Sequence, residues 1–504
     1  MPGSYWLASL GCPKNQVDAE KIEGSLIAAG RRKARRPADA EMLIVNTCAF
    51  IEAAREESVD TILELVEVRQ PGAKLIVTGC MAQRYGDELA AALPEVDVVS
   101  AAGIGEEILA AAPSMPAAGD RAPKERAGVE RDGSGNERGS GSPPISVRVT
   151  EGAHRASTAL LDLDRPRPGH SWAYLKVAEG CDRRCGFCAI PLFKGAQVSR
   201  SVELIMRELD GLGDGVREVV LVAQDLASYG MDAGSRHRRW QEQPARRTSA
   251  VGTASEAPAG DGAILSRSAF RGDAGGRTPL VDLVEKCAQR IERVRLLYLY
   301  PSAVSDVLVD TVCSTGVPYF DLSLQHASRG LLRKMKRWGG AERFLELIGR
   351  IREREPEAVL RSSFVIGYPG ETEADHAELL SFLEEAQLEW AGFFRFSEEE
   401  GTYAAGLPGK VPFELAMERL RECSELQDAV TVYRRTRQIG RVLSVLVDRP
   451  GEARSYMEAP EIDGIIRVPR HLPAGSLVTV RVVSAVGVDL EALEVAAAMK
   501  LQHG

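Results

Sequence analysis

Three short apolar runs lie near the start of the chain, and each of them ends in a cysteine. They extend from Trp6 to Cys12, from Leu43 to Cys48 and from Leu75 to Cys80. Their unbroken Leu, Ile and Val residues predict strands that are buried on both faces, as in a parallel sheet. Residues 15–30 and 51–66 show the spacing of helices. This alternation predicts a doubly wound α/β domain whose parallel strands all point one way.

The middle of the chain repeats the strand-then-helix rhythm. The predicted strands are Trp172–Ala178, Glu218–Val222, Val294–Tyr300, Tyr319–Leu324, Leu360–Ile366 and Ala391–Phe396. Six such units predict a (βα)6 barrel or partial barrel with its active site at the carboxyl ends of the strands. From about Gln438 the pattern changes to short Val-rich strands separated by Pro and Gly, which predicts a small antiparallel β-barrel.

Two stretches interrupt this globular pattern. Residues 113–147 and 233–276 are rich in Gly, Pro, Ser and charge, which predicts a flexible linker and a solvated insertion. A basic run near the start of the insertion leaves open a second interpretation, an adaptor for an acidic partner. The chain is therefore expected to contain an N-terminal domain at 1–112, a central domain at 148–436 and a C-terminal domain at 437–504.

Composition agrees with a folded protein of about three domains. The 504 residues are 44% hydrophobic and 27% charged. No apolar run approaches the roughly 20 residues needed to cross a bilayer, and no secretion signal is recognised, so we expect a cytoplasmic protein without a membrane span. In that reducing compartment, nine cysteines favour metal ligation or catalysis over disulfides. A net charge of −9 argues against broad binding of nucleic acid.

The densest cysteine motif follows the first predicted strand of the central domain. Cys181, Cys185 and Cys188 form a C-x3-C-x2-C pattern. Thiolates are the ligands of iron-sulfur clusters, and a cubane cluster usually takes four of them. Three local cysteines leave one iron open, as a catalytic centre requires. Zinc is the competing metal, although a zinc site normally shows two separated pairs or a nearby histidine.

The cysteines of the N-terminal domain are also expected to converge. Cys12, Cys48 and Cys80 each follow a predicted parallel strand, and the carboxyl ends of such strands gather at one edge of the sheet. The alternative is that they are three buried structural thiols. The remaining cysteines lack partners at ligand spacing and are expected to be structural: Cys287, Cys313 and Cys423.

The C-x3-C-x2-C motif, with Phe187 before its third cysteine, closely resembles the signature of the radical S-adenosylmethionine (radical SAM) superfamily. The resemblance implies that its three cysteines hold a 4Fe-4S cluster whose open iron binds S-adenosylmethionine. An electron passed through the cluster then releases a 5'-deoxyadenosyl radical, which the protein directs at one hydrogen. Phe187 is expected to lie against the bound adenosyl group, with ordinary packing as the alternative.

Other candidate residues lie at the ends of predicted strands. Gly367 and Gly370 follow the fifth strand, where glycine lets a backbone approach the cofactor closely. Polar residues at ligand-facing strand ends are Gln224, Asp225, Gln325 and His326, of which the histidine is interpreted as structural. No side chain is assigned a catalytic role.

The whole architecture resembles the methylthiotransferase family, which has an N-terminal cluster domain, a radical SAM barrel and a C-terminal domain of the TRAM type. The resemblance implies that Cys12, Cys48 and Cys80 hold a second, auxiliary 4Fe-4S cluster that presents or supplies sulfur. In this family the radical removes a hydrogen from an unactivated carbon. A second S-adenosylmethionine then donates the methyl group.

Local motifs point to one branch of this family. Residues 11–15 (GCPKN), 45–52 (VNTCAFIE) and 459–464 (APEIDG) resemble the branch that modifies small-subunit ribosomal protein S twelve. That branch adds a methylthio group to the β-carbon of an aspartate. The resemblance implies this ribosomal protein, free or in the ribosome, and an electron donor such as flavodoxin as partners.

Two rival functions remain. A tRNA methylthiotransferase would share both clusters, but the charges between Arg441 and Leu493 nearly balance, whereas a tRNA-binding domain should carry surplus positive charge. Nucleic acid is therefore not expected as the direct substrate. The second rival is a non-catalytic iron-sulfur or zinc protein that binds RNA through its last domain.

Overall fold

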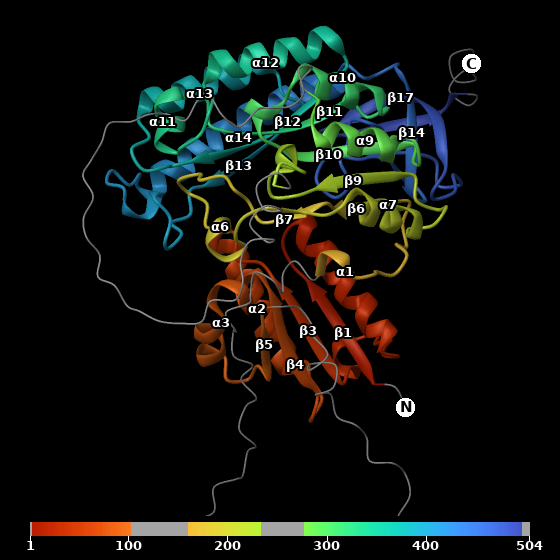
Figure 1. Ribbon diagram of the computed structural model, residues 1–504. Coiled ribbons are helices and arrows are strands. Elements are labelled where there is room, and N and C mark those ends of the chain that lie inside the picture. The colour runs from red at the N-terminus through yellow and green to blue at the C-terminus, as the bar shows by residue number, and fades with distance from the viewer. Residues whose placement is uncertain (1–2, 102–159, 233–276, 496–504) are drawn as a thin grey trace, which may run out of the picture. The chain divides into compact units, whose positions relative to one another are not determined.

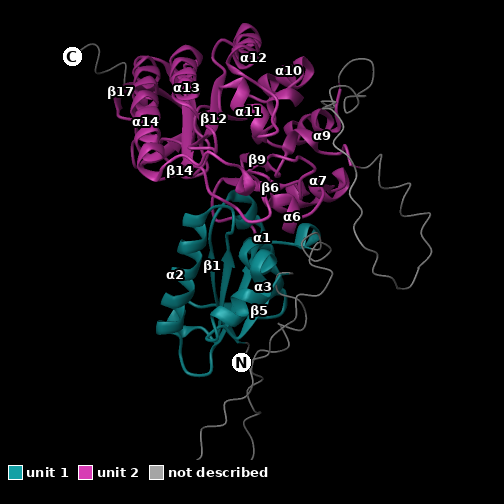
Figure 2. Cartoon of the chain, turned by 90° about the vertical axis from the view of Figure 1, so that its left-hand side faces the viewer, with its two compact units in different colours: residues 1–165 teal, residues 166–504 magenta. Residues whose placement is uncertain are grey.

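The computed structural model describes residues 3–101, 160–232 and 277–495. The chain divides into two compact units, residues 1–165 and 166–504, which Figure 2 shows in different colours. Both predicted low-complexity stretches lie outside the described residues, and the predicted domain limits stay predictions. No helix in the described ranges is long and apolar enough to cross a membrane.

The first unit contains a five-stranded sheet in which every strand pair is parallel. Its strands are β1 (Ser4–Ser9), β2 (Arg32–Lys33), β3 (Met42–Thr47), β4 (Lys74–Gly79) and β5 (Val98–Ser100). Its helices are α1 (Pro13–Ala28), α2 (Glu52–Val68) and α3 (Cys80–Ala92), with short 3-10 turns at Pro37–Asp39 and Leu160–Asp162. The predicted doubly wound domain is confirmed.

Helices cover both faces of this sheet (Figure 1). Ile22 of α1 packs with Ile44 on one face, whereas Ile62 of α2 and Leu89 of α3 pack with Leu43 on the other. Successive residues of a strand point to opposite faces, so a strand covered on both sides needs apolar residues at every position. This explains the unbroken apolar runs in the sequence.

The strand order β2-β1-β3-β4-β5 places a topological switch point between β1 and β3. Chain connections leave these two neighbouring strands in opposite directions, which opens a crevice beyond their carboxyl ends where such sheets bind ligands. Cys12 lies just beyond β1, and Cys48 follows β3 directly. Two of the candidate ligands are therefore placed at the switch point by topology.

The second unit is built on a six-stranded parallel sheet in the order β13-β12-β11-β10-β9-β6. Its strands are β6 (Trp172–Lys176), β9 (Glu218–Val222), β10 (Arg293–Leu299), β11 (Tyr319–Gln325), β12 (Val359–Ile366) and β13 (Trp390–Arg395). Its larger helices are α7 (Val202–Gly211), α9 (Pro279–Ala288), α10 (Asp306–Ser314), α11 (Arg329–Lys334), α12 (Ala341–Arg354), α13 (Glu373–Ala386) and α14 (Phe413–Thr436). The sheet does not close, which confirms the predicted partial barrel.

The two faces of this sheet differ in chemistry. Leu221 and Phe320 belong to a large apolar core that also takes side chains from the surrounding helices. Alternate positions of the same strands, which point the other way, carry polar residues such as Glu218, Arg295 and Asp321. The face away from the helices is therefore polar and charged although it is buried.

The chain ends in a closed five-stranded barrel. Its strands are β14 (Val442–Arg449), β15 (Glu452–Arg454), β16 (Ile466–Arg467), β17 (Leu477–Val486) and β18 (Asp489–Glu494). All pairs are antiparallel except β16 with β18, which is parallel. The predicted small barrel is confirmed, with this one parallel pair as a departure from an antiparallel meander.

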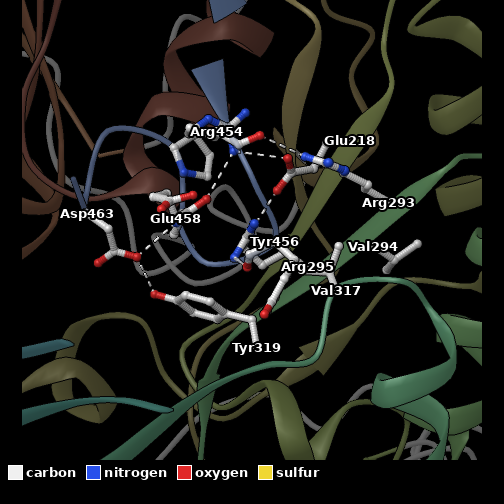
Figure 3. A network of polar contacts seen from close by, with 12 residues as sticks. Glu218, Arg293, Val294, Arg295, Val317, Tyr319, Arg454, Tyr456, Glu458 and Asp463 are labelled. Carbon is white, nitrogen blue, oxygen red and sulfur yellow. Dashed lines mark hydrogen bonds and ion pairs between the residues drawn. The ribbon is translucent and has the colours of Figure 1, made fainter. Parts of the chain in front are cut away.

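A buried polar network joins this barrel to the amino ends of the parallel strands (Figure 3). Glu218, the first residue of β9, accepts hydrogen bonds from Arg295 (2.7 Å) and Arg454 (3.0 Å). Tyr319, the first residue of β11, donates to Asp463 (2.6 Å). We call this contact the amino-edge seam. The segment 459–464, which resembled a family branch in the sequence, therefore lies at the edge opposite the carboxyl ends of the strands.

Candidate functional site

The three cysteines of the first unit lie at the carboxyl ends of three parallel strands. Cys12 immediately precedes α1, Cys48 follows β3, and Cys80 is the first residue of α3 directly after β4. Burial raises the pKa of the Cys48 thiol above its usual value, and the nearby Cys12 adds to the effect. The predicted convergence of these loops is thus supported by their placement.

Asn15 ties the three loops together. Its side-chain amide donates to the carbonyls of Leu10 and Thr47, each at 2.8 Å, so it bridges the ends of β1 and β3. Its side-chain oxygen lies 3.6 Å from the Sγ of Cys80, which donates to it. Asn46 in turn donates to the Asn15 carbonyl at 2.7 Å. The sequence motif contained Asn15, but nothing local indicated this bridging role.

Gly11 is required by the close approach of Cys48. Its φ is +90°, and a Cβ added there would lie 2.7 Å from the Cβ and 2.8 Å from the Sγ of Cys48. We expect Gly11→Ala to displace the Cys48 side chain and to cost about 1–3 kcal/mol of stability. If Cys12, Cys48 and Cys80 hold an auxiliary cluster, as the sequence predicts, this variant should lose it. The iron content of anaerobically reconstituted protein measures the loss of the cluster, and thermal unfolding measures the loss of stability.

Gly30 provides the matched control, because it also has a positive φ (+77°) but an added Cβ would meet nothing within 4 Å. Gly30→Ala is expected to show only the backbone cost of about 1–2 kcal/mol and full iron content. Equal iron content in Gly11→Ala and Gly30→Ala would contradict the expected displacement of the Cys48 side chain.

The C-x3-C-x2-C loop and the one-turn α6 (Ile190–Phe193) lie between β7 (Ala178–Glu179) and β8 (Val198–Ser199), which pair as a short antiparallel ribbon. Gly180 has a φ of +80°, and an added Cβ would lie 2.4 Å from the Ala196 carbonyl oxygen. The Cys181 amide donates to the Gly195 carbonyl at 3.0 Å. The ribbon therefore fixes the first cysteine.

The second half of this loop is held by two further segments. The Gly186 amide donates to the Met335 carbonyl at 2.8 Å, and the Gly186 carbonyl accepts from the Ala404 amide at 2.8 Å. A Cβ on Gly186 would lie 2.9 Å from the hydroxyl of Tyr368. These contacts attach the second half of the loop to both segments.

The three thiols of the loop lie close enough to influence one another. Burial raises the pKa of Cys181 and of Cys188 to about 12, and in both cases the neighbouring Cys185 adds to the effect. Such thiols hold their protons until a metal cation displaces them, so cluster binding releases protons. The donor set fits a cluster with three thiolate ligands.

Within the described ranges, no three His, Cys, Asp or Glu side chains are arranged to hold a single metal ion. A cubane distributes its thiolate ligands over separate iron atoms, so the cysteines that hold one need not converge on one point.

A buried carboxylate supports the base of the loop. Glu179 forms ion pairs with Lys176 and, at 3.5 Å, with Lys194, and it accepts from the Gln224 amide at 2.6 Å. Burial by itself would raise the pKa of Glu179, but the two ammonium groups outweigh it and lower the pKa to about 2. Sequence analysis did not identify this group, because no spacing rule links these residues.

Two buried polar atoms at the end of β9 have no hydrogen-bond partner in the described part of the chain. They are Oε1 of Gln224 and Oδ1 of Asp225. Buried polar atoms are normally paired, so such orphans indicate a place for a ligand with donor groups. This supports the predicted ligand-facing position of both residues. His326 is fully buried, its Nδ1 accepts from the Ser328 amide at 3.0 Å, and burial lowers its pKa to about 4.

The predicted cofactor contacts remain predictions. Phe187 is partly buried and packs against the main core. Gly367 and Gly370 lie in the turn after β12 with φ of +79° and +77°, so their backbone conformation by itself favours glycine. An added Cβ on Gly367 would lie 2.9 Å from the Cβ of Ala416.

The three remaining cysteines lie in helices of the main core. Cys287 of α9 and Cys423 of α14 are fully buried, and Cys313 of α10 packs against the same core. These surroundings agree with the structural role expected from the sequence.

Three known families match successive parts of this chain. Residues 4–101 match "Uncharacterized protein family UPF0004", residues 175–383 match "Radical SAM superfamily", and residues 439–495 match "TRAM domain". The matched ranges correspond to the first sheet, the partial barrel and the closed barrel described above.

Proteins named "Ribosomal protein uS12 methylthiotransferase RimO" are similar to the chain over almost its whole length. The protein from Cutibacterium acnes is 38% identical, over 96% of this chain and 97% of that protein. The protein from Akkermansia muciniphila is 37% identical, over 98% of this chain and 100% of that protein. Among solved structures, the radical SAM methyltransferase TsrM from Kitasatospora setae gives a TM-score of 0.41 at 14% identity, over 78% of this chain and 72% of that one.

These family matches, on a fold that carries two separate cysteine sets, define a radical SAM methylthiotransferase. Membership of the radical SAM superfamily brings with it S-adenosylmethionine and a 4Fe-4S cluster as cofactors. The chain belongs to the RimO family of ribosomal protein uS12 methylthiotransferases. The resemblance seen in the sequence is thus confirmed.

Proposed function

We propose that this enzyme adds a methylthio group to the β-carbon of an aspartate in ribosomal protein uS12. The observation that carries the proposal is the presence of two cysteine trios in one chain, each beyond the carboxyl ends of a parallel sheet. The trio of the C-x3-C-x2-C loop suits radical generation. The N-terminal trio suits the presentation of sulfur. The near full-length similarity to proteins of that name supports the choice of substrate.

Two 4Fe-4S clusters per chain are part of the proposal. Cys181, Cys185 and Cys188 would hold the radical cluster, and the N-terminal trio would hold the auxiliary one. When bound, the radical cluster supplies the electron that cleaves S-adenosylmethionine, and a low-potential donor such as flavodoxin provides that electron. The protein holds the cysteine loop rigid and offers Gln224 and Asp225 as polar contacts at its edge.

The charges of the C-terminal barrel favour a protein over tRNA as substrate. Most of its arginines are engaged by carboxylates: Arg441 by Glu357, Arg449 by Glu452, Arg454 by Asp448 and Arg467 by Asp489. Phosphate contacts dominate nucleic-acid affinity and require available cations.

A substrate on the small ribosomal subunit also implies that the reaction takes place in the cytoplasm.

The test is an assay of the anaerobically reconstituted full-length enzyme with S-adenosylmethionine, reductant and either uS12 or tRNA. We expect mass spectrometry to find a methylthio group on one aspartate of uS12, together with 5'-deoxyadenosine. The Cys181→Ala enzyme, or uS12 lacking that aspartate, serves as the control and should give no product. Modification of tRNA alone would overturn the proposed substrate.

A further inference from the structure

The side chain of Arg337 contacts the C-x3-C-x2-C loop although Arg337 lies 152 residues after Cys185 in the chain. One end of its guanidinium group lies 3.0 Å from the Sγ of Cys185, to which it donates. The other end donates to the carbonyl of Ser323 in β11. Within residues 3–101, 160–232 and 277–495, no carboxylate forms an ion pair with Arg337. Its positive charge therefore faces a cluster ligand without a counter-charge.

Arg337 lies two residues after the C-cap residue of α11, where the helix ends in a hydrogen-bonded turn. After α11, Lys336 adopts a left-handed conformation (φ +55°) although it is not glycine. The Arg337 amide donates to the Leu332 carbonyl at 2.8 Å, and the Lys336 amide donates to the Arg333 carbonyl at 3.0 Å. This is the hydrogen-bond pattern of a Schellman motif. A non-glycine residue held in this conformation is often associated with a functional site.

A tyrosine ring lies against the guanidinium group. The Cζ atom of Arg337 lies 4.5 Å from the ring centroid of Tyr300, and that of Arg183 lies 3.9 Å from the same centroid. The Tyr300 hydroxyl accepts from the Trp338 amide at 3.2 Å. Arg183 is neutralised by Asp225 at 2.6 Å, so of these two arginines Arg337 is the one with uncompensated charge.

We propose that Arg337 is a positioning residue that raises the reduction potential of the radical cluster. The inference rests on the cluster proposed for Cys181, Cys185 and Cys188. A cubane with thiolate ligands is anionic, and it gains a further negative charge when the donor reduces it by one electron. Hydrogen bonds to cluster sulfurs and the local charge set the potential. A donated hydrogen bond and a fixed cation at Cys185 both stabilise the reduced form.

The experiment is a redox titration, followed by electron paramagnetic resonance, of the reconstituted full-length chain. The signal that is absent in Cys181→Ala identifies the radical cluster. For Arg337→Met we expect the equilibrium constant for reduction to fall at least tenfold, which is a potential lower by about 59 mV for one electron. Arg337→Lys keeps the charge without the paired donors and should shift the potential less.

The matched control is Arg343→Met, because Arg343 is exposed and its guanidinium carbon lies 5.6 Å from the centroid of the Trp338 ring, next to Arg337 in the sequence. It should leave the potential unchanged. An unchanged potential in Arg337→Met would overturn the inference. If that variant assembles no cluster, Arg337→Gln is titrated instead, and a wild-type potential there would overturn it equally.

Folded variants that cannot hold the cluster at all, with either Met or Gln, would show that Arg337 retains the cluster and does not tune it. A wild-type chain that assembles no radical cluster would instead overturn the proposed function. The two failures are therefore distinguishable.

Discussion

Replacing Cys181 with alanine is expected to remove about half of the iron from the reconstituted enzyme, from about eight to about four atoms per chain. The same change should abolish formation of 5'-deoxyadenosine, because the radical cluster would lose one of its three thiolates. Iron and acid-labile sulfide analysis, with chromatography of the adenosyl product, measures both effects.

Replacing Cys12 should also remove about half of the iron, but for a different reason and with a different result. We expect the proposed auxiliary cluster to be lost, whereas reductive cleavage of S-adenosylmethionine should continue and the methylthio product should disappear. Cys313→Ala is the control, because Cys313 lies in α10 and packs against the apolar core, away from both cysteine sets in the sequence. Colourless, zinc-containing protein with full activity would contradict two-cluster chemistry.

Replacing Glu218 with glutamine is expected to destabilise the second unit by about 3–5 kcal/mol, because buried Arg295 loses its paired carboxylate and Arg454 loses one carboxylate while it retains Asp448. Glu218, Arg295 and Arg454 are all at most 2% exposed. Trp172 and Trp390 lie beside the amino-edge seam, where the indole of Trp390 donates to the Met457 carbonyl at 2.8 Å. Tryptophan fluorescence during urea unfolding therefore reports on this region.

The same residue predicts a pH dependence. Burial by itself would raise the pKa of Glu218, but Arg454 and Arg295 outweigh it and lower the pKa from 4.5 to about 2. A depressed folded-state pKa means that the stabilisation is complete above the unfolded value and is lost as the pH falls from 4.5 towards 2. We expect the loss of stability in this window to be smaller in Glu218→Gln than in the wild type.

Glu292→Gln is the matched control for the seam. Glu292 is close by and also pairs with an arginine, Arg217, but both side chains are more than 40% exposed. Such surface pairs contribute at most about 1 kcal/mol. Similar unfolding of the two glutamine variants would contradict a stabilising role for the buried network.

Local pattern predicted the strands that carry the site. Residues 218–222 form β9 as predicted, and the other five strands of the partial barrel agree within about two residues. The short strands β2 and β5 were missed, because two or three residues are too few to show a periodicity. The parallel pairing of β16 with β18 was missed because it joins strands that are not neighbours in the sequence.

The segment 459–464 shows the limit of recognising motifs. In the sequence it served only as a family marker, and nothing in it indicated a structural task. In the structure the Tyr174 hydroxyl donates a hydrogen bond to the Pro460 carbonyl at 3.0 Å, and the Tyr319 hydroxyl donates one to the Asp463 carboxylate. The motif thus attaches the C-terminal barrel to the strands, at the edge opposite the cysteine loop.

The sequence by itself determined the two cysteine sets and their sheets. In the N-terminal set each cysteine follows its own strand, and parallel strands bring their carboxyl ends to one edge whatever the rest of the chain does. The other three cysteines share a single loop after β7, so their short spacing alone brings them together. Only the tertiary structure decided which distant groups support them, such as Arg337 at Cys185 and Arg454 at Glu218. These contacts join residues more than a hundred positions apart, and local hydrophobic spacing carries no information about which distant side chains meet.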